Sequence, residues 1–294
     1  IVTTAIEHPC VLNAAAWLRD EGFPVTFLNV DEYGRINPDA LDAAIGPDTL
    51  LVSVMAANNE IGTIQDIKKI TEIAHRHGAL VHTDATQSVG KIPVDVAAWG
   101  VDYLTMSCHK LYGPKGVGGL YLKPGAPLEP LIRGGHQEHG LRAGTYNNPG
   151  ILAFGHAAEL AHAELPAYME RVSRLRNRLR DGIVYSVPHC HVNGHPEAVL
   201  PNTLNVSFPG AEGEAILLSL DLMGIRVSTG SACASGSLEP SHVLLATGVG
   251  PELAHGSIRF SLGRDTTEED IDYVIGATGP IIERLRSMST MSSA

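Results

Sequence analysis

The stretch YLTMSCHKLYGPKG (103–116) changes from an apolar strand, Tyr103–Ser107, into a polar turn that is rich in glycine. Apolar runs of the same kind recur before and after it. They cover Ile1–Ile6, Val25–Val30, Leu50–Ala56, Leu80–Asp84 and Gly119–Leu122. Because these runs are continuously apolar and do not alternate with polar residues, we predict strands that are buried on both faces.

Helical segments separate the predicted strands. Pro9 suits the first turn of a helix that runs through Leu18 and is closed by Gly22. A short helix is predicted over Leu41–Ile45, and a longer one from about Gln65 to His77. Strands buried on both faces that alternate with helices predict an α/β fold, in which helices cover a mainly parallel sheet.

The pattern changes in the second half of the chain. A helical pattern from Ile151 is expected to break at Pro166 and to resume to about Arg180. Short strands among helices are predicted after it, at Thr203–Phe208, Ile225–Ser228 and Ser257–Ser261. We therefore predict a large domain over residues 1–165 and a smaller α+β domain over residues 166–294.

Two local signals belong to this second half. Thr266 with Glu269 is a candidate capping box, which would open a last helix at Asp270–Ile275. A basic run is expected to lie on a solvated helix face. It consists of Arg171, Arg174, Arg176, Arg178 and Arg180.

The chain has 294 residues and a formal net charge of −11, and 44% of its residues are hydrophobic. Its length suffices for one large domain or two ordinary ones with a sizeable core. The acidic balance argues against nucleic acid or an anionic membrane as the main partner. No apolar run approaches the roughly 18–20 residues that span a bilayer, and no signal peptide opens the sequence. Since the sequence starts at Ile1 inside an apolar run, we expect a longer natural chain.

Four scattered cysteines without a CxxC pair predict neither a disulfide framework nor a structural zinc site. A reducing compartment, the cytoplasm, is therefore expected. Cys108 should be a buried thiol at a strand end, and Cys10 should lie in the core. The run His189-Cys190-His191 with His195 resembles metal ligands in composition, but we predict adventitious exposure there and no metal site.

Three predicted strands end in polar residues: NNE (58–60), DATQ (84–87) and SCHK (107–110). In α/β sheets, ligands bind at the carboxyl ends of the strands. The polar side chains of these three ends should therefore converge. The expected set is Asn59, Asp84, Gln87, His109 and Lys110.

A lysine at the end of a buried strand has two interpretations. Its side chain reaches solvent, or its amine is desolvated and acts as a nucleophile. Lys110 has an acid, Asp84, 26 residues before it, which would pair with a ring nitrogen while the lysine forms an imine with an aldehyde. A pyridoxal phosphate site requires this arrangement. Lys115 is the competing lysine, but its glycine-flanked turn favours a solvated side chain.

Motifs along nearly the whole chain, in the right order, resemble those of cysteine desulfurases in the class V aminotransferase superfamily. They are ANNEIG (57–62), HTDATQS (82–88), SCHKLYGPKG (107–116), RAGT (142–145), TGSAC (229–233), SLEPSH (237–242) and SIRFSLGR (257–264). The resemblance implies the type I pyridoxal-phosphate fold, with a large α/β domain and a smaller C-terminal α+β domain. The SLEPSH segment favours the subgroup that serves iron–sulfur cluster assembly.

The resemblance implies roles around the cofactor ring. Lys110 would form the Schiff base with pyridoxal 5'-phosphate and later act as the base at Cα. Asp84 would keep the pyridine nitrogen protonated, and Gln87 would bond to the ring hydroxyl. His8, in Glu-His-Pro, would stack on the face of the ring as a further catalytic residue.

The resemblance also implies phosphate and substrate contacts. Ser107 and His109 would bind the phosphate, and Thr145 would reach it from a neighbouring protomer, which implies a homodimer. Asn59 and Arg259 would hold the carboxylate of the substrate, the arginine through a bidentate fork.

Cys233 lies in a segment of small residues, TGSACASGS (229–237), which predicts an accessible thiol on a loop. By resemblance, its thiolate would take sulfur from L-cysteine as a persulfide and leave L-alanine. An acceptor protein, such as an iron–sulfur scaffold, would receive the sulfur.

Three alternatives remain open on the sequence. They are a selenocysteine lyase, a class V aminotransferase, and a non-catalytic fragment that binds a sulfur acceptor. The last arises because relatives carry a Gly-Ala-Thr loop for the cofactor phosphate upstream of the region that matches Ile1–Ile6.

Overall fold

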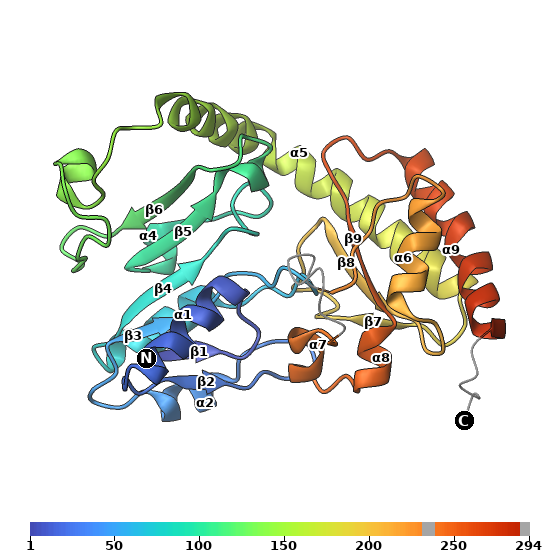
Figure 1. Cartoon of the computed structure of the whole chain (residues 1–294), viewed down its shortest axis with the longest axis horizontal. Coiled ribbons are helices and arrows are strands. Elements are labelled where there is room, and N and C mark those ends of the chain that lie inside the picture. The colour runs from blue at the N-terminus through green and yellow to red at the C-terminus, as the bar shows by residue number, and fades with distance from the viewer. Residues whose placement is uncertain (231–238, 289–294) are drawn as a thin grey trace.

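The computed structural model describes residues 1–230 and 239–288. Its larger sheet has six strands in the order β2-β1-β3-β4-β5-β6. Figure 1 shows this sheet and a smaller sheet joined by the long helix α5 (Asn148–Ser186). The strands of the larger sheet are β1 (Val2–Thr4), β2 (Thr26–Leu28), β3 (Leu51–Ser53), β4 (Leu80–Asp84), β5 (Tyr103–Ser107) and β6 (Gly118–Leu122).

The predicted α/β fold with a mainly parallel sheet is confirmed. Strands β1 to β5 pair in parallel, whereas β6 pairs antiparallel with β5 at the edge of the sheet. Val52, Val81 and Leu104 are fully buried and form one core with residues of the helices α2 (Pro38–Ala44) and α3 (Ile67–Arg76). Burial of these apolar strands beneath helices is the main stabilisation of this half.

Polar side chains set where the first four helices begin. The helices are α1 (Pro9–Asp20), α2, α3 and α4 (Val96–Trp99). Their N-cap side chains accept backbone N–H groups that have no partner inside the helix, and they belong to His8, Asn37, Asp66 and Asp95. Pro9 and Pro38 occupy the first turn, where proline costs no hydrogen bond.

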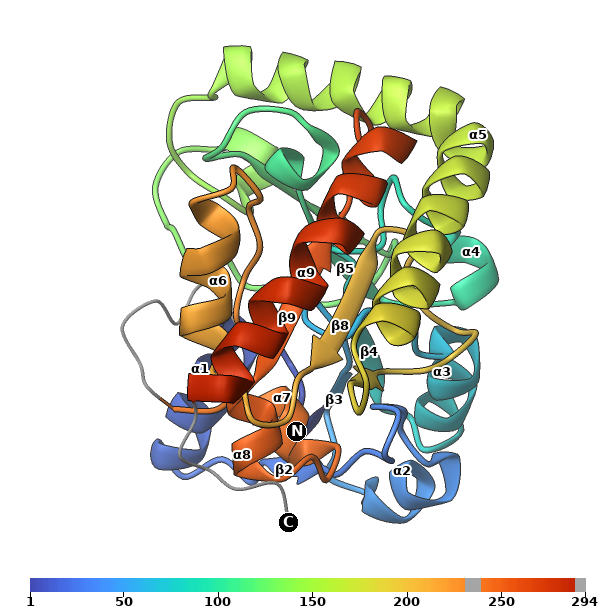
Figure 2. The ribbon, with the colours of Figure 1, turned by 90° about the vertical axis from the view of Figure 1, so that its right-hand side faces the viewer.

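Helix α5 continues through Pro166, so the predicted break at that residue is wrong. Proline removes one intrahelical hydrogen bond and favours a bend, and Figure 2 shows α5 changing direction along its length. Packing holds both halves of the helix. The first half contacts the turn after β5, and Val172, Leu179 and Ile183 of the second half lie in the core around the smaller sheet. The division into two domains at residues 165 and 166 stays a prediction.

The smaller sheet is antiparallel. Its strands pair in the order β7-β8-β9, and helices α5, α6 and α9 pack on it through one apolar core. The bounds are β7 (His191–Asn193), β8 (Thr203–Ser207), β9 (Ser257–Ser261), α6 (Gly213–Asp221) and α9 (Glu268–Met288). The strand predicted over Ile225–Ser228 is reduced to an isolated bridge between Ser228 and Arg259. In the described parts of the chain, no helix combines the length and the apolar surface needed to cross a membrane.

The prediction of a solvated arginine face holds for Arg174 and Arg178, which are exposed, and is wrong for Arg176, which is buried. Arg174 and Arg178 form ion pairs with Glu268 and Asp272 of α9. Arg176 is only 8% exposed and donates to the backbone oxygen of Leu200 at 2.8 Å. Hydrogen bonds from the guanidinium to backbone oxygen therefore accompany burial only at Arg176.

The capping box of the last helix lies one residue later than predicted. Thr267 and Asp270 bond each other's backbone N–H groups reciprocally, at 3.1 and 2.9 Å. The hydroxyl of Thr266 instead accepts the backbone N–H of Gly263. Glu269 lies within the first turn of the helix.

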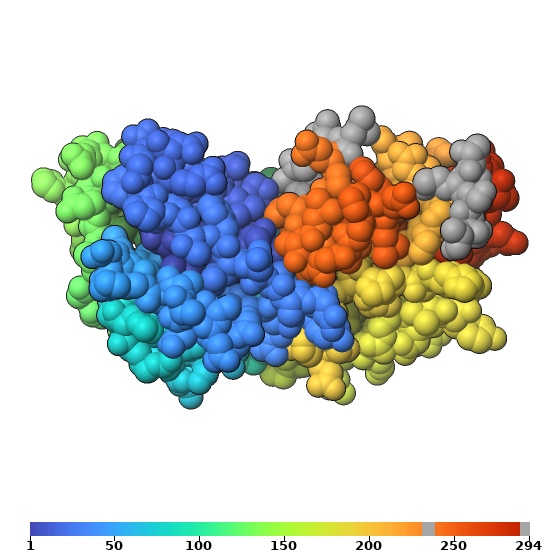
Figure 3. Space-filling view, turned by 90° about the horizontal axis from the view of Figure 1, so that it is seen from below, coloured from blue at the N-terminus to red at the C-terminus, as the bar shows by residue number. Residues whose placement is uncertain are grey.

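Two short helices join the two sheets. Helices α7 (His242–Ala246) and α8 (Pro251–His255) lie against the N-terminal residues, as the contact of orange and blue surfaces in Figure 3 shows. Val243 and Leu244 of α7 are buried in one cluster with Ile6 and Met55 of the larger unit. The sheets are thus held at a fixed separation by apolar packing.

Glu7 is a buried carboxyl group that ties β1 to β3. Its Oε1 accepts the hydroxyl of Thr4 at 2.8 Å and the backbone N–H of Met55 at 2.9 Å. His242 of α7 lies 3.0 Å from its backbone oxygen. Burial raises the pKa of Glu7 to about 8, and the charge of Asp84 adds to this rise. Glu7 is therefore protonated in the folded protein at neutral pH.

The substitution Glu7→Gln should flatten the pH dependence of stability. The folded state holds a proton that the unfolded state loses near the ordinary glutamate pKa of 4.5, so the free energy of unfolding falls as pH rises toward 8. One such proton contributes a slope of up to about 1.4 kcal/mol per pH unit.

Urea unfolding at several pH values between about 5.5 and 7.5, which lie between the unfolded-state and folded-state pKa values of Glu7, measures how the free energy of unfolding changes with pH. Glutamine keeps the acceptor for Thr4 and Met55 but has no proton to lose. Glu32→Gln, at an exposed carboxyl group, is the matched control and should keep the wild-type slope. Equal slopes in wild type and Glu7→Gln would contradict the assignment.

Candidate active site

The carboxyl ends of β3, β4 and β5 lie side by side. Backbone hydrogen bonds continue past the strand ends, from Ala56 N–H to the oxygen of Asp84 at 2.8 Å and from Ala85 N–H to the oxygen of Thr105 at 2.9 Å. Asp84 is opposite Thr105 in the ladder. Since side chains alternate along a strand, Ser107 lies on the same face as Thr105 and Asp84. The predicted convergence of these strand ends is present in the structure.

His82 links the three strands on this same face. Its ring nitrogens lie 2.8 Å from Oγ of Ser53 on β3 and 3.2 Å from Oγ1 of Thr105 on β5. Burial lowers the pKa of His82, although the charge of Asp84 opposes the shift. The Oδ1 atom of Asp84 accepts the backbone N–H of Thr86 at 2.9 Å, which fixes the orientation of its carboxylate. Gln87 follows in the same turn and is half-buried.

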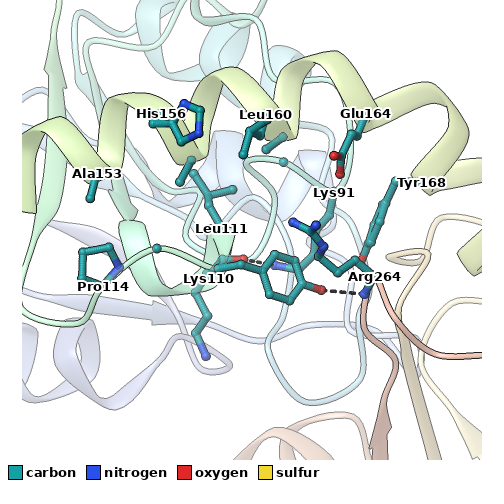
Figure 4. Close-up of a pocket in the computed structure, with 15 residues that line it drawn as sticks. Lys91, Lys110, Leu111, Pro114, Ala153, His156, Leu160, Glu164, Tyr168 and Arg264 are labelled. Atoms are coloured by element: carbon teal, nitrogen blue, oxygen red, sulfur yellow. Dashed lines mark hydrogen bonds between the residues drawn. The ribbon is translucent and has the colours of Figure 1, made fainter.

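Lys110 lies in the 3-10 turn η1 (Cys108–Leu111), directly after β5. Cys108 is buried, as predicted, and burial raises the pKa of its thiol. A side chain at Gly113 would meet Cys108 Sγ at 2.1 Å, so glycine is required where the chain turns back. Figure 4 shows the Lys110 side chain extending away from α5. Lys115 is exposed, as predicted.

His8 is placed by its role as the N-cap of α1. Its Nδ1 accepts the backbone N–H of Cys10 at 3.2 Å and lies 3.1 Å from Cys10 Sγ. A neutral His8 ring in this arrangement carries its proton on Nε2. Cys10 is exposed, so its predicted place in the core is wrong. Partial desolvation of the thiol by its neighbours, followed by the charge of Asp84, raises the pKa of Cys10.

Ser107 and His109 both precede Lys110, Ser107 as the residue before η1 and His109 as the second residue of η1. The pKa of exposed His109 is lowered by partial desolvation and then by the charges of neighbouring lysines, of which Lys110 is the largest contributor. A dianionic phosphate would be favoured in such a cationic surrounding.

Arg259 and Asn59 meet where the two sheets face each other. Arg259 is on β9, and its Nη1 donates to the backbone oxygen of Asn59, which follows β3, at 2.8 Å. The side-chain Oδ1 of Asn59 is buried without a hydrogen-bond partner among the described residues. A buried acceptor of this kind is costly unless a ligand or water satisfies it.

Two predicted site residues are not joined to this group. Thr145 is exposed on the connection between β6 and α5, beyond the edge of the larger sheet (Figure 1). Cys233 lies outside the described residues, between Gly230 and Glu239.

The sequence reasoning missed three buried polar residues around the site. Glu7 directly precedes His8, and Glu60 directly follows Asn59. Oγ of Ser241, the N-cap residue of α7, donates to Oε2 of Glu60 at 2.5 Å. Lys91 is the third, and its ammonium lies near the backbone of Lys110. The available signal was an acid or a lysine within an apolar and glycine-rich segment, as in SVGKIPV (88–94).

The residues present fit pyridoxal phosphate. Asp84 supplies a carboxylate on the strand next to Lys110, His8 lies at the start of α1, and Ser107 with His109 offers donors in a cationic surrounding. The unsatisfied amide oxygen of Asn59 beside Arg259 fits a polar ligand with a carboxylate and an amino group. No described group of three or more histidine, cysteine or acidic residues is arranged to hold a metal ion.

Relatives with known names match nearly the whole chain. A cysteine desulfurase IscS of Methanosarcina thermophila is 50% identical over 292 residues, which cover 99% of this chain and 72% of the relative. Cysteine desulfurase 2 of Trichormus variabilis is 50% identical over 293 residues, with coverage of 100% and 73%.

Solved structures agree with these matches. A NifS-like protein superposes with a TM-score of 0.86 at 40% identity, covering 98% of this chain and 74% of the other. A NifS-like protein from Rickettsia africae gives a TM-score of 0.87 at 32% identity, with coverage of 96% and 75%. The family model described as Aminotransferase class-V matches residues 1–274. The chain that gathers a lysine, an aspartate and a histidine at its strand ends therefore belongs to the class V aminotransferases, and the relatives it matches are named cysteine desulfurases.

Proposed function

We propose that this protein is a pyridoxal-phosphate-dependent cysteine desulfurase that converts L-cysteine to L-alanine and keeps the sulfur as a persulfide on Cys233. The observation that carries the proposal is the placement of Asp84 and Lys110 at the ends of the adjacent strands β4 and β5, together with the contact of Arg259 with Asn59, which follows the neighbouring strand β3. Relatives named cysteine desulfurase, at 50% identity, support it.

The bound cofactor supplies an electron sink for the bonds at Cα of the substrate. Lys110 holds the cofactor, and its amine takes the proton from Cα. Asp84 bonds the ring nitrogen, Gln87 the ring hydroxyl, and His8 stacks on the ring. Each of these side chains starts from a strand end or a helix start, which limits its freedom before ligands bind.

Arg259 and Asn59 orient the substrate by its carboxylate. A guanidinium forms two parallel hydrogen bonds with a carboxylate, and the side-chain N–H of Asn59 donates to the same group. The unsatisfied Oδ1 of Asn59 accepts from the amino group of the substrate. Ser107 and His109 hold the phosphate.

Cys233 completes the reaction. Its thiolate attacks the substrate sulfur, so that the Cβ–Sγ bond breaks and an S–S bond forms. The electron pair of the broken bond stays on Cβ and is protonated, which yields alanine. One L-cysteine and one thiol give one L-alanine and one persulfide, without an external oxidant. A sulfur acceptor, such as an iron–sulfur scaffold protein, then receives the sulfur, and scattered cysteines favour a reducing, cytoplasmic compartment for this step.

A homodimer is part of this proposal. Thr145 reaches the phosphate of the neighbouring protomer from a segment that also exposes apolar side chains. Leu131 of this segment is 96% exposed, and Ile132 and Tyr146 are exposed as well. Exposed apolar groups of this kind favour a protein interface.

Lysine substitutions test the cofactor linkage. After cofactor loading and borohydride reduction, the wild-type mass should rise by one reduced cofactor, located on the peptide that contains Lys110. Lys110→Ala should lose this adduct, because the amine that forms the imine is gone, whereas Lys115→Ala should keep it. An adduct on another lysine in the wild type would refute the assignment of Lys110.

The substitution Cys233→Ser should separate cofactor binding from sulfur release. Alanine production from L-cysteine should fall by about a hundredfold or more, since serine has no thiolate to take the sulfur. The visible absorbance of the lysine-bound cofactor should stay. The matched control is Cys190→Ser, which removes a half-buried thiol just before β7 and should retain alanine production. Unchanged alanine production by Cys233→Ser would contradict the role of this thiol.

The substitution Leu131→Asp should weaken the dimer, because a carboxylate would be buried in an apolar interface. Sedimentation velocity measures the dimer fraction as a function of protein concentration. Leu222→Asp changes a leucine that is 88% exposed after α6 and should leave the dimer intact. A wild-type protein that stays monomeric at all concentrations would exclude the shared site.

A further inference from the structure

Lys91 is a buried amine outside the set of residues that the family resemblance assigns. It is 6% exposed and lies in the turn that follows β4 and the Asp84–Gln87 segment. Lysine is rarely buried unless its ammonium group has a partner, because the charge loses its hydration. The partner of Lys91 therefore indicates why a lysine occupies this position.

The ammonium of Lys91 contacts the backbone of Lys110. Its Nζ donates to the carbonyl oxygen of Lys110 at 3.4 Å. Figure 4 shows this contact on one side of η1, with the Lys110 side chain extending in another direction, away from α5. Lys91 thus holds the peptide unit of the residue whose amine must reach the cofactor.

Packing makes this contact part of a rigid unit. Backbone N–H groups of Lys91 and Ile92 both bond to the oxygen of Ser88 at 3.0 Å, and Ser88 N–H bonds to the oxygen of Ala85 at 2.8 Å. Gly90 has a φ of +73°, and a side chain there would meet Cδ2 of Leu111 at 2.3 Å. The turn that begins next to Asp84 is therefore pressed directly against η1.

Several charged and titratable groups surround Lys91. A cavity of about 280 Å³ lies beside its turn and is also lined by groups from η1, from α5 and from the segment after β9. They are Lys110 and Tyr112 at η1, His156, Glu164 and Tyr168 on α5, and Arg264 after β9. Burial, followed by the charge of Lys110, lowers the pKa of Lys91 to about 8. Two like charges act on each other reciprocally, so the charge of Lys91 also opposes a positive charge on Lys110.

We propose that Lys91 is a positioning residue: by holding the Lys110 carbonyl against the turn that directly follows Asp84, it fixes the distance between the reactive amine and the carboxylate that binds the cofactor ring. This inference rests on the proposed function, in which Lys110 carries the cofactor. Lys91 itself touches neither substrate nor cofactor in this role. It acts through the backbone of Lys110 and through its charge.

Three variants test the proposal: Lys91→Met removes the donor and the charge, Lys91→Arg keeps both, and Lys68→Met changes an exposed lysine of α3 as the matched control. In the cofactor-free proteins, hydrogen exchange should become faster in Lys91→Met for peptides within residues 105–113. Lys91→Arg and Lys68→Met should keep the wild-type exchange. Because this readout needs no cofactor, it reports the contact between Lys91 and the Lys110 backbone separately from cofactor binding.

Cofactor binding gives the second readout. The dissociation constant of pyridoxal phosphate, measured from its visible absorbance, should rise by at least about tenfold in Lys91→Met, the size typical of a lost orienting partner. The pH midpoint of the lysine-bound absorbance band should move upward, because a neighbouring positive charge is gone. Lys91→Arg should restore most of the affinity and the wild-type midpoint, which a loss of packing alone would not explain.

The outcomes are separable. Wild-type exchange, affinity and midpoint in Lys91→Met would overturn the positioning role and leave the proposed function intact. A wild-type protein that forms no cofactor adduct on Lys110 would defeat the proposed function and with it this role, whatever the exchange shows. If Lys91→Met fails to fold, Lys91→Gln, which keeps a shorter donor without the charge, replaces it; unchanged exchange, affinity and midpoint in that variant would again overturn the proposal.

Discussion

The parallel pairing of β4 with β5 is the constraint on which the candidate site depends. It places Asp84 opposite Thr105 and brings Ser107, and then Lys110, to the same edge of the sheet. Side chains alternate between the two faces of a strand, so a shift of one residue in the pairing of β4 with β5 would turn Asp84 to the opposite face of the sheet. The buried side chains of Val81 and Leu104 fix the register, because they must face the core with α2 and α3. The chemistry at this edge thus depends on apolar packing on the other face.

The junction between the two sheets provides the second half of the site. Arg259 reaches Asn59 from β9, and His242 of α7 contacts the backbone of Glu7 beside His8. Apolar packing of α7 against Ile6 and Met55 holds this junction together. Arg259, for which we propose a substrate contact from the smaller sheet, is therefore placed by a core whose members have no proposed part in the chemistry.

Several features were decided by contacts that the sequence pattern does not contain. Helix α5 spans Pro166 because its first half contacts η1 and its second half lies in the core around the smaller sheet, and this packing outweighs one lost hydrogen bond. Arg176 is buried because backbone oxygens from a distant segment meet its guanidinium. Cys10 is exposed although it lies on a predicted helix, since only one side of α1 faces the protein. Glu7 and Lys91 were not recognised, because their partners lie 48 and 19 residues away in the sequence.

By itself, the sequence determined the elements and their chemistry: continuous apolar runs produced the parallel strands, and the motifs at their ends identified the family. These signals are local, because an apolar strand and a motif are each contained in a short stretch of consecutive residues. Tertiary structure alone decided which strand ends are neighbours, that Arg259 meets Asn59 across 200 residues of chain, and that the Lys91 ammonium lies against the Lys110 carbonyl. The physical reason is that hydrogen bonds and charge contacts depend on distances in space, and the order of residues does not specify those distances until the core has packed.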